Sequence, residues 1–371
     1  MNTTARRFVV GTAVAALALA MGACGKAGDD KKSDNKDSSA SSSSDSGKKS
    51  IGLLLPDTVT ARYEKFDKPL IEQKIHELCS DCNVEYANAG GDPAKQAQQV
   101  SAMVAKGVKV LILDAQDYIG IKSSVQAAVD KGIKVVAYDR LAQGPVSAYV
   151  SYDNEKVGEL QGQALLDAMG ANATPKSKIV MINGDDADPN AAEFKQGAHK
   201  ILDGKVTIAY EQSGLWKGDV ANQKVTAAIS SVGKDNIKGV YSANDTMAGG
   251  IATALHAKDI NVPLTGQDAD LAAIQRILTG AQTSTVYKAA KPEAFATAEI
   301  AVDLLQGKDF KSVADTTKKS GSGDIVPAKL LDAVSVTKAN IKDTVLADGT
   351  YTAAQICTGD AAAACGAAGI K

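Results

Sequence analysis

Short apolar runs alternate with stretches of helical periodicity along much of this 371-residue chain. The runs at residues 50–56, 83–87, 108–113 and 133–138 are rich in Val, Ile and Leu, which is typical of strands buried on both faces of a sheet. Residues 62–78, residues 121–131 and a segment capped by Asp92-Pro93 have the spacing of helices. This alternation predicts a parallel sheet with helices on both of its faces.

The same pattern begins again in the second half of the chain. Strands are expected at residues 179–182, 206–211 and 239–242, and helices at residues 193–202, 220–231 and 247–258. The chain is long enough for two cores, so we expect two α/β lobes that face each other across a cleft. No Gly-x-Gly-x-x-Gly motif follows a strand, which argues against a dinucleotide-binding dehydrogenase.

Polar side chains follow the expected strands of both halves. Asp139 and Arg140 end the run at residues 133–138, and ligands usually bind at the carboxyl ends of parallel strands. The corresponding residues of the second half are Asn190, Trp216, Asn222, Asp245 and Asp268. Carboxylates, amides and a guanidinium suit the hydroxyl groups of a small polyhydroxylated molecule, and an indole suits the flat face of a sugar ring.

Each of these residues also has a plainer structural explanation. Asp139 and Arg140 are equally compatible with surface charges at a strand end. Trp216, the single tryptophan, is compatible with a core or surface anchor. Asp245 and Asp268 are compatible with N-caps of the segments that follow them, because Asp is a favoured capping residue.

The N-terminus has the features of an export signal. Arg6-Arg7 precedes an apolar run from Phe8 to Met21, which is too short for a permanent membrane span. The small residues before Cys24 resemble a bacterial lipobox, so residues 1–24 are expected to be a lipoprotein signal peptide with Cys24 as the lipidated residue. Ordinary cleavage with unmodified Cys24 is the alternative. Residues 25–49 are rich in Lys, Asp, Ser and Gly, which predicts a disordered tether.

Four further cysteines, Cys79, Cys82, Cys357 and Cys365, are expected to form disulfides in an exported chain. Three pairings are possible, and the local pairs 79–82 and 357–365 are favoured. A redox or metal role for the Cys-x-x-Cys motif is the alternative, but no second such motif and no His cluster accompanies it. The net charge of −2 gives no indication of a nucleic-acid partner.

Several longer motifs resemble the type I periplasmic sugar-binding proteins of bacterial ABC importers. They are Ala137-Tyr138-Asp139-Arg140, residues 151–160, Ser242-Ala243-Asn244-Asp245, residues 266–271, Thr285-Val286-Tyr287-Lys288 and residues 340–345. The resemblance runs from about residue 49 to about residue 349, and the C-terminal Ala-rich segment has no counterpart in it.

The resemblance implies two Rossmann-like lobes joined by a three-segment hinge near residues 149–153, Lys288 and residues 330–333. Residues 50–149 plus 289–330 would form the first lobe, and residues 150–288 plus 331–371 the second. It also implies a monomeric receptor without catalytic activity, cofactor or metal. The receptor would bind D-xylose or a similar aldopentose in the cleft and deliver it to an ABC permease at the outer face of the cell membrane.

Carried over residue by residue, the resemblance places ten side chains at the sugar site: Arg62, Tyr63, Asp139, Arg140, Asn190, Trp216, Asn222, Asp245, Asp268 and Lys288. Tyr63 departs from the Trp expected there, and the loop at residues 56–60 differs as well. Other monosaccharides remain alternative ligands. A sugar hydrolase with Asp139 and Asp245 as paired carboxylates is a further alternative. A repressor with the same core is excluded, because the signal and tether stand where its DNA-binding helices would be.

Overall fold

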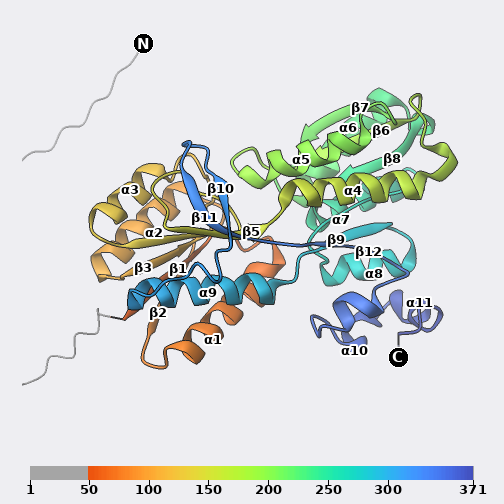
Figure 1. The fold of residues 1–371 in the computed structure, drawn as a ribbon. Helices are drawn as coiled ribbons and strands as arrows, with labels where there is room; N and C mark the ends of the chain where they lie inside the picture. The colour runs from red at the N-terminus through yellow and green to blue at the C-terminus, as the bar shows by residue number, and fades with distance from the viewer. Residues whose placement is uncertain (1–48, 371) are drawn as a thin grey trace, which may run out of the picture. The chain divides into compact units, whose positions relative to one another are not determined.

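The computed structural model describes residues 49–370, which belong to one compact unit. The expected signal peptide, Cys24 and the tether up to residue 48 lie outside the described residues. A seven-stranded, a three-stranded and a two-stranded β-sheet make up the unit together with their helices (Figure 1). We call the elements around the seven-stranded sheet the N-terminal lobe and those around the two smaller sheets the C-terminal lobe. The predicted α/β class is confirmed, and most strand pairs are parallel.

The sheet of the N-terminal lobe has seven strands. Their spatial order is β10 (Thr316–Lys319), β11 (Ile325–Leu331), β5 (Ala148–Tyr152), β4 (Lys134–Tyr138), β3 (Val110–Leu113), β1 (Ser50–Leu55) and β2 (Asn83–Asn88). Only the edge strand β10 is antiparallel to its neighbour, and the sequence analysis did not foresee the β10–β11 pair.

Helices cover both faces of this sheet because successive strand residues point to opposite sides. Ile51 and Leu53 of β1 belong to a core shared with α1 (Lys68–Leu78) and α9 (Ala290–Gln306). Leu54 belongs to a second core with α2 (Pro93–Lys106) and α3 (Lys122–Asp130). A π-helical turn, η1 (Tyr63–Asp67), precedes α1, so the helix expected from residue 62 begins with a wider turn.

The sheet of the C-terminal lobe has the strand order β7 (Thr207–Ser213), β6 (Lys178–Asn183) and β8 (Ile237–Ser242). Backbone bonds from residues 263–268 connect β8 to an antiparallel pair, β9 (Ser284–Tyr287) and β12 (Val334–Thr337). The helices are α4 (Asn154–Met169), α5 (Pro189–Leu202), α6 (Gly218–Val232), α7 (Asp245–His256) and α8 (Leu271–Thr279). Short 3₁₀ turns follow α4 and α6 at η2 (Gly170–Asn172) and η3 (Lys234–Asn236).

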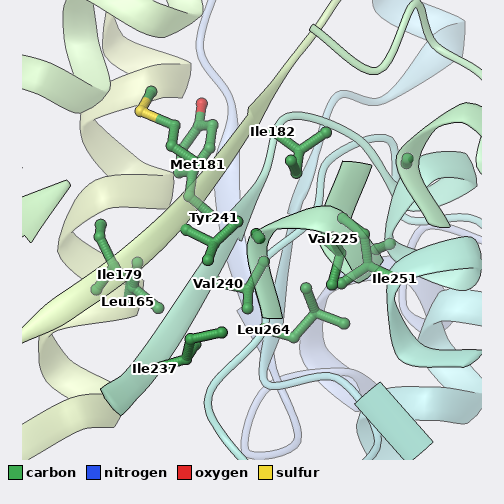
Figure 2. Close-up of a cluster of buried hydrophobic side chains, with 14 of the residues drawn as sticks. Leu165, Ile179, Met181, Ile182, Val225, Ile237, Val240, Tyr241, Ile251 and Leu264 are labelled. Atoms are coloured by element: carbon green, nitrogen blue, oxygen red, sulfur yellow. The ribbon is translucent and has the colours of Figure 1, made fainter. Parts of the chain in front are cut away.

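The core of this lobe lies between its strands and the flanking helices. Figure 2 shows Ile179 and Met181 of β6 and Val240 of β8 among apolar side chains from α4, α6 and α7. All three are fully buried. This core fixes the strand ends from which the polar side chains of the lobe project.

The chain passes between the two lobes three times, at residues 152–154, 287–290 and 331–334. Two of these segments are bonded together, because Asp153 N donates to Leu331 O at 3.1 Å. The remaining segment, residues 287–290, carries Lys288 directly after β9. The lobe boundaries given in the sequence analysis follow these segments and remain our proposal.

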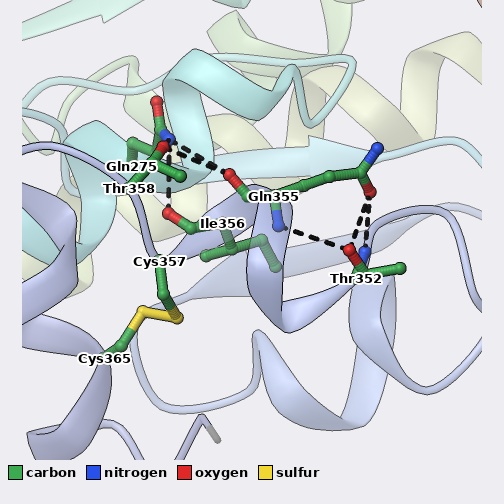
Figure 3. Close-up of a disulfide and its surroundings, with 7 residues drawn as sticks. All are labelled: Gln275, Thr352, Gln355, Ile356, Cys357, Thr358 and Cys365. Atoms are coloured by element: carbon green, nitrogen blue, oxygen red, sulfur yellow. Dashed lines mark hydrogen bonds between the residues drawn. A yellow bond between two sulfur atoms is a disulfide. The ribbon is translucent and has the colours of Figure 1, made fainter.

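The C-terminal segment packs on α8 of the C-terminal lobe. It contains η4 (Lys342–Leu346), α10 (Ala353–Ile356) and α11 (Ala361–Ala367), and a disulfide joins Cys357 to Cys365 (Figure 3). Gln275 of α8 donates to Ile356 O at 3.2 Å, and Thr352 and Gln355 form a capping box at the start of α10 (Figure 3).

The second disulfide joins Cys79 to Cys82 after α1, so the structure has the two local pairings. The one group of potential metal ligands found in residues 49–370 is Cys79, Asp81 and Cys82, in which both thiols are already bonded to each other. No helix in the described part of the chain combines the length and apolar character needed to cross a bilayer.

Candidate ligand-binding site

A polar pocket lies where the carboxyl ends of strands from both lobes meet. It has about 300 Å³ of space not filled by protein atoms, including its opening to solvent. Its lining comes from η1, from the start of α5, from the loops after β1, β4, β6, β7, β8 and β9, and from residues 263–268. The lining residues are Thr60, Arg62, Tyr63, Asp139, Asp188, Asn190, Phe194, Trp216, Asn244, Gln267, Asp268 and Lys288. This is the position that open α/β sheets use for ligands.

Asp139 lies at the centre of the pocket, one residue beyond β4. It has a φ of 55°, and Arg140 N donates to Tyr138 O across it, which makes a tight turn that non-glycine residues rarely adopt. Ser151 Oγ and Tyr149 Oη donate to the Asp139 carbonyl at 2.8 and 3.0 Å and hold the turn. The buried core therefore fixes the direction of this carboxylate.

Two cations face the Asp139 carboxylate from different parts of the fold. Its Oδ1 lies 3.7 Å from Lys288 Nζ and 3.8 Å from Arg62 Nη1. Burial alone would raise the pKa of this carboxyl, but Lys288 and Arg62 outweigh burial and the pKa is lowered. Asp139 is therefore an ionised acceptor, which suits it to accept hydrogen bonds from hydroxyl groups.

The guanidinium of Arg62 binds two buried acidic side chains. Its Nε donates to Asp67 at 2.9 Å and its Nη2 to Glu293 at 2.5 Å. Burial raises the pKa of Asp67 to about 6 and that of Glu293 to about 8, against the opposing effect of Arg62. Arg62 Nη1 makes no hydrogen bond to any described residue, and Arg62 lines the pocket.

The C-terminal lobe contributes an aromatic wall. Trp216 has a φ of 59° and lies edge-on to Phe194, with ring centroids 6.3 Å apart. Gly184 leaves room for the indole: a Cβ at that position would lie 2.0 Å from Trp216 Cζ2. The indole Nε1 is buried and has no hydrogen-bond partner within residues 49–370.

Asp268 and Gln267 of the C-terminal lobe also line the pocket. Asp268 has a φ of 96°, accepts from Gln267 Nε2 at 2.8 Å and lies 3.7 Å from Lys288 Nζ. Gln267 Oε1 is a third buried polar atom without a partner among the described residues. Three lining residues thus adopt positive φ, and such strained backbone clusters at functional sites.

Seven of the ten expected site residues line the pocket: Arg62, Tyr63, Asp139, Asn190, Trp216, Asp268 and Lys288. Asn190 links the two lobes, because its Nδ2 donates to the Asp139 carbonyl at 3.1 Å. Tyr63 accepts from Arg140 Nη2 at 3.2 Å and donates to Asp139 at 3.5 Å.

The other three expected residues lie outside the lining and are bonded to protein. Arg140 is neither a surface charge nor a lining residue, because its buried Nε lies 2.9 Å from Asp188 Oδ2 of the C-terminal lobe. Half-buried Asn222 donates to Gly250 O at 2.9 Å. Asp245 lies behind Gly266 and accepts from Gln282 and Thr285 at 2.7 and 2.8 Å. None of the three lines the pocket in this structure, and their direct contact with a ligand stays a prediction.

Five lining residues were missed by the sequence analysis: Thr60, Asp188, Phe194, Asn244 and Gln267. Asn244 and Gln267 lie inside motifs that had been singled out, and Phe194 lies one helical turn after Asn190. Asn244 rather than Asp245 is the N-cap of α7, accepting from Met247 N at 3.0 Å. Asp188 precedes Pro189 as the N-cap of α5, a signal that was available in the sequence.

Similarity to known proteins agrees with this geometry. The periplasmic binding protein domain family matches residues 51–309. The chain is 37% identical over 311 residues to the D-xylose-binding periplasmic protein of Haemophilus influenzae, covering 81% of this chain and 90% of that protein. It is 32% identical to the multiple sugar-binding periplasmic protein SbpA of Azospirillum brasilense, covering 83% of this chain and 91% of that protein.

A solved structure of a sugar-bound protein is similar to this chain over most of its length. It is an ABC transporter solute-binding protein from Clostridium phytofermentans with bound β-D-glucose, at 26% identity and a TM-score of 0.75. The match covers 83% of this chain and 100% of that chain.

Proposed function

Because this chain belongs to the periplasmic binding protein family, whose members described above are sugar receptors rather than enzymes, we propose that it is the D-xylose receptor of an ABC importer. It binds D-xylose, or a similar aldopentose, between its lobes and delivers the sugar to the permease. Cys24 carries a lipid that holds the receptor at the outer face of the cell membrane.

The observation that carries this proposal concerns three of the buried polar atoms that make no hydrogen bond to any described residue, Arg62 Nη1, Trp216 Nε1 and Gln267 Oε1. All belong to lining residues of one pocket, within the described part of the chain. A buried polar atom without a partner is costly, so a ligand that supplies hydrogen bonds to all three is favoured. Two of the atoms are donors and one is an acceptor, which matches sugar hydroxyls that both accept and donate.

The charged side chains supply the affinity. Asp139 and Asp268 accept from hydroxyl groups, while Arg62 and Lys288 donate to them. A hydrogen bond that involves a charged partner contributes about 1.5–3 kcal/mol in such a site. The Trp216 indole lies against the apolar C–H face of the ring.

The hydrolase alternative loses its carboxylate pair in this structure. It requires Asp139 and Asp245 on the two sides of one bond. Asp245 lies outside the pocket lining, and its carboxylate accepts from three protein donors, Gln282, Thr285 and the backbone N of Asp270.

The test is calorimetric titration of residues 49–371 with D-xylose, D-ribose, D-glucose and D-galactose. Tight 1:1 binding with D-xylose preferred supports the proposal. Preference for another sugar removes the assignment of xylose and keeps the receptor, and no binding of any sugar overturns the function. Labelling of the full chain with a radioactive fatty acid, compared with Cys24→Ala, tests the lipid anchor separately.

A further inference from the structure

One ion pair joins the two lobes outside the sugar pocket. Lys318 lies on the edge strand β10 of the N-terminal lobe, and Glu193 lies in the first turns of α5 in the C-terminal lobe. The Lys318 Nζ and Glu193 Oε1 atoms are 2.7 Å apart. Neither residue lines the pocket, and both side chains are a little under one-third exposed, at 29% and 27%.

The helix that carries Glu193 also carries a pocket residue. Asn190, three residues earlier, donates to Asp139 of the opposite lobe. The helix cannot move independently of α4, because its Gly197 approaches α4 so closely that a Cβ there would lie 1.9 Å from Glu155 O. A lobe motion that separates Asn190 from Asp139 therefore also separates Glu193 from Lys318.

The other contacts that cross the cleft on this side adjoin the pocket. Arg140 is paired with the lining residue Asp188, and Tyr118 N donates to Ala187 O beside it at 3.1 Å. Changes at those positions would alter the sugar contacts as well as closure. Lys318–Glu193 differs from these two because it joins the lobes without touching the pocket lining. Lys65 and Phe66 also reach the other lobe outside the pocket, but their contact with the Tyr351 ring is not an ion pair.

We propose that Lys318 and Glu193 form a latch that stabilises the closed receptor and sets its affinity for every sugar alike. This inference rests on the proposed function. Both are positioning residues that act through lobe closure, so they affect affinity and leave the ratio of affinities between sugars unchanged. The pair stabilises the closed form by the same amount whichever sugar is bound, so it changes the apparent affinity for every sugar by the same factor.

The expected effect follows from the exposure of the pair. Partly exposed ion pairs of this kind contribute modestly, which corresponds to roughly a 1.5- to 5-fold weaker affinity when the pair is removed. The loss should fall mainly on the dissociation rate, because the pair forms only after the lobes approach. The loss of affinity should become smaller at about 1 M salt, where the screening length falls to about 3 Å.

The experiment compares Lys318→Met, Glu193→Gln and the double variant by calorimetry at low and high salt. Each single variant should weaken D-xylose and a second bound sugar by the same factor, and the double variant should be no weaker than the singles. The charge exchange K318E/E193K should restore affinity. The control is Lys329→Met, which removes a pair with Asp315 of 2.6 Å that lies within the N-terminal lobe and should leave affinity unchanged.

Unchanged affinity in K318M and E193Q, in a wild type that binds sugar, overturns the latch and leaves the proposed function intact. A changed sugar preference also overturns it, because the pair would then act on the pocket. Small-angle scattering of the ligand-free protein tests the latch without any sugar: K318M should have a larger radius of gyration than K329M. Equal radii would count against the latch, even if the wild type bound none of the sugars.

Discussion

Substitution of Gly184 by alanine should damage the sugar site through one contact. Gly184 follows β6 and has no positive φ, so alanine is compatible with its backbone. Its Cβ, however, would lie 2.0 Å from Cζ2 and 2.2 Å from Cη2 of Trp216. Carbon atoms pack at about 3.5 Å, so the indole must move by about 1.5 Å.

The pocket lies on one side of this ring, so we expect the ring to move into the space that the sugar would fill. Overpacking of this kind costs about 1–3 kcal/mol where the neighbours cannot move, and the open side should keep the loss of unfolding free energy near the lower value. An aromatic contact contributes about 0.5–1.5 kcal/mol beyond buried area, so affinity should fall by at least about 2- to 12-fold.

Calorimetric titration with D-xylose and denaturant unfolding measure the two effects separately. The matched control is Gly366→Ala in α11, where a Cβ would have no heavy atom within 4 Å. Gly366→Ala should bind as the wild type does. Undiminished affinity in Gly184→Ala would show that Trp216 is not a sugar contact and would refute this reasoning.

Two further predictions concern buried carboxylates. The pKa of Glu293 is raised by burial from its ordinary 4.5 to about 8, so the folded protein holds a proton that the unfolded chain releases over this range. The contribution of Glu293 to the free energy of unfolding therefore falls as pH rises from about 5 to 8. In Glu293→Gln the denaturation midpoint should decline less over this pH range. An equal decline in the variant and the wild type would contradict the raised pKa of Glu293. Asp245→Ala should lower the unfolding free energy by about 1–3 kcal/mol, because Gln282 and Thr285 lose their acceptor, and should weaken all sugars alike. Lost binding with unchanged stability would instead make Asp245 a direct sugar contact.

The alternation of apolar strands and helices was enough to predict an α/β fold with two lobes, because strands buried on both faces have a distinctive composition. It was also enough to place Asp139 at a strand end, since the apolar run stops there. Five strands in the described part of the chain were not expected: β5, β9, β10, β11 and β12. β10 is polar and mostly exposed and β12 is only four residues long, so neither has the apolar run of a buried strand.

The remaining differences arise at single-residue turns. Asn244 and Asp245 are adjacent and both can cap a helix, but only the backbone conformation decides that Asn244 faces the pocket while Asp245 faces Gln282. The positive φ values of Asp139, Trp216 and Asp268 are equally unforeseeable, because positive φ is uncommon for any residue other than glycine. Tertiary contacts impose these conformations. At Asp139 they are the hydrogen bonds that Tyr149 and Ser151 donate to its carbonyl.

A crystal structure of residues 49–371 grown with D-xylose tests the central claim most directly. The account predicts one sugar between the lobes, with its ring against Trp216 and its hydroxyl groups within hydrogen-bond distance of Arg62 Nη1, Asp139 and Asp268. Glu193 and Lys318 should be paired in that closed form. A sugar bound elsewhere, or a pocket that contains no sugar at saturating D-xylose, would contradict it.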